Sequence, residues 1–402
     1  MTDDTANRRG NLVLLLVAVC LVAANMRPTI TGLGPLLTQI GADTGMSVST
    51  LGVLAAVPLV AWALFSPVAH TLSRRYGQQR VLLWSLLVLL AGTVVRSLPG
   101  PLVSLWAGTA LIGIALAIVN VLMPVLVKRD FPGHVAGMTA LYTALLAGFG
   151  AISSGVVVPI SRIEVGGEPG GWRFALLVTG GILLPFGIVA WWWVQRGPGG
   201  RHVRASGPRG RTGIWADPVA WLVAAYMGLQ SAMFYMLVTW LAAISMSTGR
   251  SEVVAGIDVM VYQLFSLAGT VLLPLLMRGR VERFAAALIP ALGIVGVIGL
   301  MMAPEGVLGW TPLLGLASGA SLGMSLTLMA QRARDHDTAS ALSGMSQSVG
   351  YAVAALGPVL FGWLHSLTGG WTLPLAVMLA MNVALSLVGL FAGRDRYVLE
   401  GR

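Results

Sequence analysis

Long runs of apolar residues, separated by short polar connections, account for most of this chain. Twelve of these runs approach or exceed the about 20 residues that a helix needs to cross a membrane. Their expected ranges are Leu12–Gln39, Ser49–Leu72, Val81–Leu98, Leu102–Val127, Val135–Ser161, Trp172–Val194, Pro218–Ser247, Val253–Met277, Phe284–Met302, Leu308–Met329, Ala339–His365 and Leu373–Ala392. We therefore predict an all-α membrane protein with twelve transmembrane helices.

A polar stretch, Gln195–Asp217, divides the runs into two sets of six. It is rich in Gly, Pro and Arg, as expected for a solvated connection. We predict an N-terminal six-helix bundle over residues 1–194, a basic linker over 195–217 and a C-terminal six-helix bundle over 218–402. The composition agrees with this class, since 56% of the 402 residues are hydrophobic and only 10% are charged.

The formal net charge of +10 would suit a nucleic-acid-binding protein, but the positions of the basic residues argue against one. Most Lys and Arg residues fall in alternate connections, with the two termini and the linker on the same side. The other side holds only Arg96, Arg162, Arg173 and Arg250. By the positive-inside rule, both termini and the linker are cytoplasmic, and the protein is expected in the bacterial inner membrane.

An arginine lies deep inside the first apolar run, in the sequence Asn25-Met26-Arg27-Pro28. A guanidinium keeps its proton, and placing one at the centre of a bilayer costs at least about 2.5–3.5 kcal/mol. We predict that Arg27 binds a small anionic or strongly polar solute halfway along a transport pathway. The alternative is a structural charge held by backbone carbonyls or by a fixed acid. The candidate acid is Asp258, although the two residues are expected at different depths.

Further polar side chains are expected at membrane depth and could surround Arg27. Together with Arg27 they form our predicted substrate site: Asn25, Asn120, Tyr142, Gln230, Ser231, Tyr235, Tyr262, Gln263, Gln347 and Tyr351. Each could instead make a hydrogen bond between helices. Amide and phenol groups around one guanidinium would suit a small planar anion or a polar heterocycle.

Residues for other chemistry are missing from the predicted membrane interior. No Asp or Glu lies at the centre of any run, and the five histidines fall at helix ends or in connections. No nucleotide-binding, hydrolase or zinc motif occurs, so we expect neither enzymatic activity nor a cofactor or bound metal. Proton coupling should be weak or indirect, which leaves facilitated diffusion, anion exchange or symport through Asp258 as the coupling residue.

The two halves of the chain share short sequence similarities at a fixed offset. Gly137-Met138-Thr139 corresponds to Gly344-Met345-Ser346, and 344 − 137 = 207. Gly108 and Gly315 are separated by the same offset, as are Gly150 and Gly357. This indicates a parallel duplication of a six-helix unit, which is the pattern of the major facilitator fold. The solute is then expected between the two pseudo-symmetric bundles.

Several motifs are similar to those of one transporter family. They are Asn25-Met26-Arg27-Pro28, Gly34-Pro35-Leu36-Leu37, Asn120-Val121-Leu122-Met123-Pro124, Gly228-Leu229-Gln230-Ser231, Thr239-Trp240-Leu241 and the run from Ser343 to Tyr351. With these motifs the chain resembles major facilitator superfamily transporters of the CynX/NimT branch, which carry cyanate or 2-nitroimidazole. The loop Ser73–Arg80 lacks the acidic residue usual in the superfamily. The carboxylate contact that this residue makes at the cytoplasmic gate is therefore not expected here.

The resemblance and the residues together predict a secondary active or facilitative transporter working by alternating access. The expected partners are a small solute, the lipid bilayer and, as a candidate coupling ion, the proton, and we expect a monomer. Two alternatives stay open at this stage. One is a multidrug or toxic-compound exporter of the same fold, and the other is a non-transporting membrane sensor.

Overall fold

The computed structural model describes residues 2–196, 213–277, 282–394 and 396–400. Four arginines of the predicted linker, Arg201, Arg204, Arg209 and Arg211, lie outside the described residues. The N-terminal half consists of α1 (Thr2–Met26), α2 (Pro28–Thr31), α3 (Leu33–Thr44), α4 (Val48–Tyr76), α5 (Gln78–Ser97), α6 (Leu102–Asp130), α7 (Val135–Ser161), the strands β1 (Glu164–Val165) and β2 (Glu168–Pro169), α8 (Gly171–Gly181) and α9 (Leu184–Arg196).

The C-terminal half follows the same plan with fewer interruptions. It consists of the short 3₁₀ helix η1 (Ile214–Ala216), α10 (Pro218–Ser247), α11 (Glu252–Leu276), α12 (Glu282–Met302), the 3₁₀ helix η3 (Pro304–Gly306), α13 (Val307–Gln331), α14 (His336–Thr368) and α15 (Thr372–Ala392). Asp217 caps α10, because its side chain accepts hydrogen bonds from the backbone N–H groups of Val219 and Ala220.

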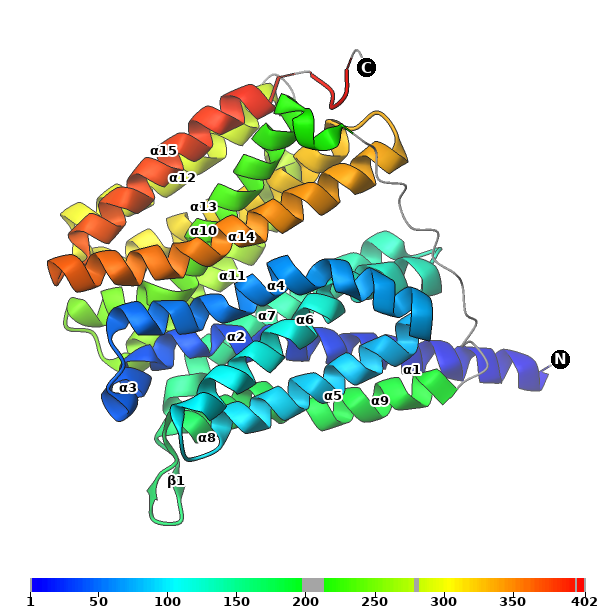
Figure 1. Cartoon of the computed structure of the whole chain (residues 1–402), viewed down its shortest axis with the longest axis horizontal. Coiled ribbons are helices and arrows are strands. Elements are labelled where there is room, and N and C mark those ends of the chain that lie inside the picture. Colours follow the sequence, from blue (N-terminus) through cyan, green and yellow to red (C-terminus); the bar gives the residue numbers. More distant parts are fainter. Residues whose placement is uncertain (1, 197–212, 278–281, 395, 401–402) are drawn as a thin grey trace.

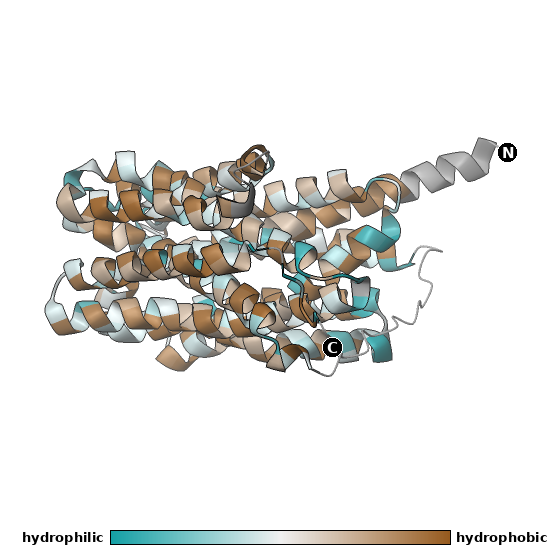
Figure 2. Ribbon diagram, turned by 90° about the horizontal axis from the view of Figure 1, so that it is seen from above, coloured by the Kyte–Doolittle hydropathy of each residue, from teal (hydrophilic) through white to brown (hydrophobic). Residues whose placement is uncertain are grey.

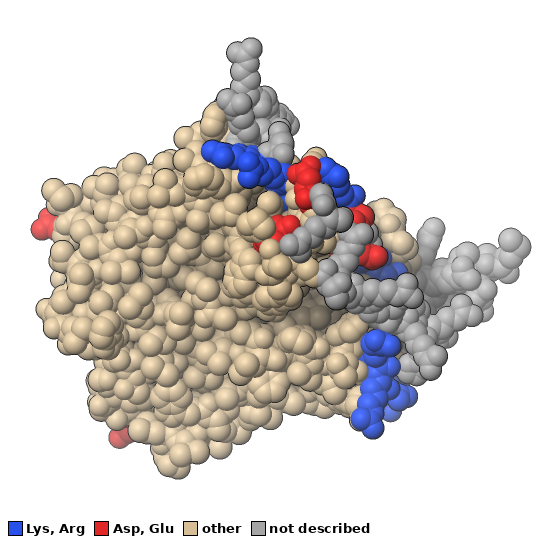
Figure 3. Space-filling model, turned by 45° about the horizontal axis from the view of Figure 1, so that its top comes forward, with Lys and Arg blue, Asp and Glu red and all other residues tan. Residues whose placement is uncertain are grey.

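The predicted twelve-helix architecture is confirmed. Within the described residues, twelve helical spans are long and apolar enough to cross a membrane. Apolar residues run along the helices, as the colours of Figure 2 show. On the face drawn in Figure 3, the Lys and Arg side chains gather at one end of the molecule and most of the remaining surface is uncharged.

The two halves of the chain form two bundles that lie side by side. In Figure 1 the helices α10–α15 form the upper bundle and α1–α9 the lower one. Both ends of the chain emerge at the same end of the molecule, which we call the terminal end, and the opposite end is called the distal end. Across the interface, α4 packs on α14, α7 on α11 and α3 on α10.

The first span differs from the single helix expected over Leu12–Gln39. Its helix is interrupted at Arg27 and again at Gly32, giving the three consecutive pieces α1, α2 and α3. Pro28 causes the first interruption, because proline has no N–H to donate and its ring disfavours a regular preceding turn. Both interrupted positions keep near-helical backbone angles, so the span continues in the same general direction.

The sixth span is interrupted too, and the two interruptions lie next to each other. Helix α8 ends at Gly181 and α9 begins at Leu184, just before Pro185. A Cβ atom at Gly180 would lie 3.0 Å from the Cγ2 atom of Thr29 in α2. The close approach of these two segments therefore depends on a residue without a side chain.

The bundles touch most closely in the distal half of the molecule, and glycines make this approach possible. A Cβ atom at Gly52 would lie 2.6 Å from the carbonyl oxygen of Pro358, and one at Gly256 would lie 2.8 Å from that of Ser154. Gly34 is packed still more tightly against the carbonyl of Val238. Each of these contacts joins one bundle to the other.

The same helices separate toward the terminal end. In the first half of α7, the neighbouring residues Thr139, Ala140, Leu141 and Thr143 are all exposed. Because successive residues point around the helix, this part of α7 is exposed on several sides. In this conformation the interface is closed at the distal end and open at the terminal end.

Polar contacts reinforce the distal end. Glu252 at the start of α11 accepts hydrogen bonds from Gln39 at 3.0 Å and from Arg162 at 3.2 Å, which connects the two bundles. Asp43 accepts bonds from Arg173 and from the indole of Trp172. These bonds lower the pKa of the Asp43 carboxyl, so its stabilising contribution is lost as the pH falls through the lowered value.

The closed distal interface predicts an effect of adding one methyl group. We expect Gly34→Ala to destabilise the protein by about 1–3 kcal/mol, because overpacking forces backbone and side chains to shift. Gly344→Ala is the matched control, since a Cβ at Gly344 meets nothing within 4 Å and α14 continues through it. Thermal unfolding of the purified variants in detergent measures the difference, and equal melting temperatures would contradict the tight contact.

Candidate functional site

Side chains of neighbouring helices donate hydrogen bonds to the backbone carbonyls of the interrupted first span. Ser153 of α7 donates to the carbonyl of Pro28 at 3.3 Å, and Ser154 donates to that of Thr31 at 3.0 Å. Arg96 of α5 donates to the carbonyl of Thr29 at 2.7 Å. Hydrocarbon offers no water to carbonyls outside a regular helix, so these side chains donate in place of water. The carbonyl of Pro28 also accepts from the backbone N–H of Gly32 at 3.2 Å.

This segment presents Arg27 to the interface between the bundles. The guanidinium lies over the ring of Phe234 in α10, 5.3 Å from the ring centroid. Gly150 of α7 makes room for it, since a Cβ there would lie 2.9 Å from the Cβ atom of Arg27. Among the described residues, no carboxylate lies within 4.0 Å of the Arg27 guanidinium and no side chain is hydrogen-bonded to it.

Arg27 lines a cavity of about 140 Å³ between the bundles. Such a space is about ten times the volume that admits one water molecule, so it can hold a small solute or several waters. Its described lining consists of Arg27, Thr143, Leu146, Ala147, Met227, Gln230, Ser231, Phe234, Tyr235, Gln263, Ser266, Leu267, Thr270, Leu322, Leu326 and Tyr351. Arg27 is the charged residue of this set, and the others divide between polar and apolar side chains.

Six of the predicted site residues meet at this cavity: Arg27, Gln230, Ser231, Tyr235, Gln263 and Tyr351. Gln230 donates to the hydroxyl of Ser231 at 2.7 Å. Gln263 donates to the hydroxyl of Ser154 at 2.7 Å, and Ser154 in turn reaches the interrupted segment next to Arg27. A hydrogen-bonded chain therefore joins α11 of one bundle to α7 and α2 of the other.

Two of the cavity tyrosines share an aromatic neighbour. The ring of Trp62 in α4 contacts Tyr235 and Tyr351 edge to face, with centroid distances of 6.1 and 5.2 Å. Trp62 belongs to the N-terminal bundle and both tyrosines to the C-terminal bundle. The indole thus fixes two phenol rings that face the cavity, and it adds an aromatic contact between the bundles.

Five other predicted residues lie outside the described lining of this cavity. Asn25 donates to the carbonyl of Leu21 in its own helix, and its amide faces Gly187 of α9. Gln347 donates to Ser343, also within its own helix, and Asn120 lies half-buried on α6.

The two remaining tyrosines of this group lie near the cavity without lining it. Tyr142 donates its hydroxyl to the sulfur of Met26 at 3.2 Å, and it is within electrostatic reach of Arg27. Tyr262 lines a second, smaller cavity of about 20 Å³ inside the C-terminal bundle. Gln230 lines both cavities, so its side chain lies between them.

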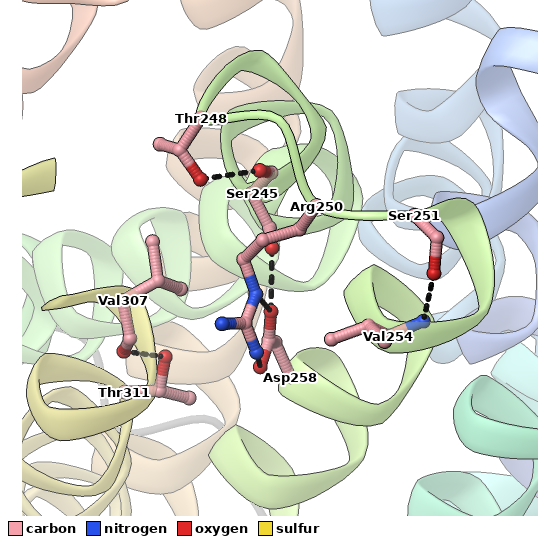
Figure 4. Close-up of polar contacts among 8 residues, drawn as sticks. All are labelled: Ser245, Thr248, Arg250, Ser251, Val254, Asp258, Val307 and Thr311. Carbon is pink, nitrogen blue, oxygen red and sulfur yellow. Dashed lines mark hydrogen bonds and ion pairs between the residues drawn. The ribbon is translucent and has the colours of Figure 1, made fainter. Parts of the chain in front are cut away.

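Asp258, the predicted coupling residue, lies in the distal part of α11, away from the cavity lining. Its carboxylate is fully buried and accepts two hydrogen bonds from Arg250, each of 2.9 Å, and one of 2.5 Å from Ser245 (Figure 4). A buried carboxylate paired in this way fastens the connection between α10 and α11. The structural pairing of Asp258 is therefore with Arg250 and not with Arg27.

Several lining residues were missed by the sequence analysis, although helical periodicity points to them. On α11, Ser266, Leu267 and Thr270 follow Gln263 at spacings of 3, 4 and 7 residues. Met227 and Phe234 share the face of Gln230 in the same way, and Thr143 and Ala147 precede Gly150 on α7. No group of three or more potential metal-binding side chains occurs among the residues described.

Comparison with known proteins identifies the family. The profile described as Major Facilitator Superfamily matches residues 14–355. The 2-nitroimidazole transporter of Escherichia coli (strain K12) is 37% identical over 99% of this chain and all of its own length. The cyanate transport protein CynX of the same organism is 27% identical over 94% of this chain and 96% of its own.

Solved structures of the same fold agree with this result. A bacterial homologue of the human lysosomal transporter Spinster, in an inward-facing and unoccupied conformation, superposes with a TM-score of 0.80. The superposition covers 96% of this chain and 97% of that one at 15% sequence identity, which shows a common fold. This protein belongs to the major facilitator superfamily, within the branch that contains the CynX and 2-nitroimidazole transporters.

Proposed function

We propose that this protein moves a small anion or polar heterocycle, similar to cyanate or a nitroimidazole, across the bacterial inner membrane. The observation that carries the proposal is the Arg27 guanidinium, which faces a cavity between the bundles without a carboxylate partner among the described residues. A positive charge in low dielectric is stabilised by an anion or by several strong acceptors. A bound solute would supply them.

The cavity walls favour a small and partly apolar solute. Leu146, Leu267 and Leu322 line one part of the space, while Gln230, Gln263 and the tyrosines line the rest. A planar solute could accept hydrogen bonds from the fork of the guanidinium and place its apolar surface against the leucines. Relatives named for cyanate and 2-nitroimidazole transport, both compact molecules, support this range of solutes.

Alternating access is the mechanism that suits the two bundles. Residues 1–194 and 218–402 would rock about the cavity as two units, with the basic linker of 195–217 joining them. The positive-inside pattern makes the terminal end cytoplasmic, so the described conformation would receive or release the solute on the cytoplasmic side. We propose a monomer that transports without enzymatic chemistry.

Changing the shape of the positive group at position 27 should weaken solute binding. Lysine keeps the charge but loses the planar donor fork, so we expect Arg27→Lys to raise the Kd at least about tenfold, and Arg27→Met to raise it further. Titration of purified protein with cyanate and with 2-nitroimidazole, followed by tryptophan fluorescence, measures the Kd.

Arg74→Lys, at an exposed position of the terminal end, is the matched control and should leave the Kd unchanged. The melting temperatures of all variants without solute show whether the fold is kept. An unchanged affinity in well-folded Arg27→Lys and Arg27→Met would remove Arg27 from the binding site.

The cavity also predicts how uptake responds to protons. No Asp, Glu or His occurs in the described lining, so we expect uptake to change less than about threefold when a pH gradient is imposed. Uptake of labelled cyanate into proteoliposomes, with protein-free liposomes as the baseline, measures this. A steep dependence in the native protein would contradict the expectation, and repeating it with Asp258→Asn would show whether Asp258 is responsible.

A further inference from the structure

A second arginine is buried in the N-terminal bundle, and no sequence feature associated it with the solute site. Arg96 lies in the last turn of α5, and only 1% of its surface is exposed. Its Nη1 atom donates to the carbonyl oxygen of Thr29 at 2.7 Å, while its Nε and Nη2 atoms have no hydrogen-bond partner among the described residues. No described carboxylate lies within 4.0 Å of it.

Burying an arginine to satisfy one carbonyl lowers the stability of the fold more than a neutral donor would. The neighbouring carbonyls accept from neutral groups: that of Pro28 from the hydroxyl of Ser153 and the backbone N–H of Gly32, and that of Thr31 from the hydroxyl of Ser154. A buried guanidinium with two unpaired nitrogens lowers stability, because the N–H groups on these nitrogens lose their hydration. The use of a charged side chain where a neutral hydroxyl would serve suggests that Arg96 does more than satisfy this carbonyl.

The place of the bond along the chain indicates that role. Thr29 is two residues after Arg27, inside the short helix α2 that lies between the two interruptions of the first span. Arg96 reaches this segment from α5, Ser153 and Ser154 hold it from α7, and Gly180 of α8 packs against it. Arg27 projects from the same segment into the cavity, where it lies over Phe234.

The position of Arg96 is itself closely fixed. A Cβ atom at Gly108 of α6 would lie 2.6 Å from both the Cα and Cβ atoms of Arg96. Helix α6 therefore packs directly on the backbone that carries the guanidinium. A displacement of this backbone would be passed to Thr29 through a single short hydrogen bond.

We propose that Arg96 is a positioning residue for Arg27. Its hydrogen bond to the Thr29 carbonyl fixes α2 and thereby holds the Arg27 guanidinium at the cavity in the orientation that binds solute. The effect on solute binding rests on the function proposed above for Arg27. The effect of Arg96 on the placement of Arg27 is independent of that function, because it concerns only the contact between α5 and α2.

The affinity test compares Arg96→Met, Arg96→Lys and the control Arg332→Met by titration with cyanate and with 2-nitroimidazole. Arg332 is also buried and donates to a backbone carbonyl, that of Gly393, but it lies in the other bundle and outside the cavity lining. We expect Arg96→Met to raise the Kd at least about tenfold, Arg96→Lys to restore most of the affinity, and Arg332→Met to change only the melting temperature. Equal Kd values for Arg96→Met and the native protein would overturn the proposal.

A double-mutant comparison asks whether Arg96 acts through Arg27. In the Arg27→Met background, we expect Arg96→Met to cause less than a twofold further change in Kd, because the group that it positions is gone. Independent, multiplying losses would show that Arg96 affects binding by another route and would overturn the proposal. Gly108→Ala, which displaces Arg96 without removing it, should raise the Kd in the same direction and serves if Arg96→Met does not fold.

A labelling experiment separates this proposal from the function of Arg27. The Arg27→Cys variant, made in a Cys20→Ser background, is treated with a water-soluble maleimide with and without Arg96→Met. We expect the labelling rate to change at least about threefold when Arg96 is replaced, and to stay constant with Arg332→Met. If the labelling rate changes while the native protein binds neither solute, the positioning role stands and the proposed substrate is wrong. An unchanged labelling rate would refute the positioning role.

Discussion

The structure depends on how a broken membrane helix satisfies its backbone in the absence of water. Pro28 interrupts the first span, and the carbonyls around it are taken up by side chains of α5 and α7. This anchoring allows an irregular segment to lie at the interface between the bundles, where it presents Arg27 to a cavity. Irregular backbone at membrane depth is tolerated where protein or a cavity surrounds it, and both conditions hold here.

The sequence predicted the architecture well because membrane spans can be recognised from the order of apolar and polar residues along the chain. Length and hydropathy were enough for the twelve spans, and the offset of 207 residues was enough for two related bundles. The interruptions of the first and sixth spans were harder to predict. Pro28 and Pro185 lie at the two interruptions, but a proline alone does not predict one, because Pro58 and Pro67 lie inside the continuous α4.

The lining of the candidate cavity was predicted in part, and the residues that do not line it have a common physical explanation. Apolar residues face both the lipid and the bundle interior, so the pattern of a membrane helix does not show which face is turned to the centre. Gln230 and Gln263 line the cavity, whereas Asn25 and Gln347, which are just as polar, do not. A hydrogen bond within the helix does not separate the two groups, because Gln230 also donates to Ser231 of its own helix. Asp258 illustrates the same limit, because its partner Arg250 is a loop residue whose approach depends on the fold.

The two bundles contribute different chemistry to the cavity, and this division bears on transport. Arg27 comes from the N-terminal bundle, while Gln230, Ser231, Tyr235 and Tyr351 come from the C-terminal bundle. Under alternating access, a solute bound to Arg27 and to this wall would contact both bundles at once. A ligand shifts a conformational equilibrium only through its differential affinity for the two states. A solute that bridges the bundles has such a difference whenever rocking changes the distance between Arg27 and the opposite wall, so the placement of Arg27 by α2 would govern coupling as well as binding.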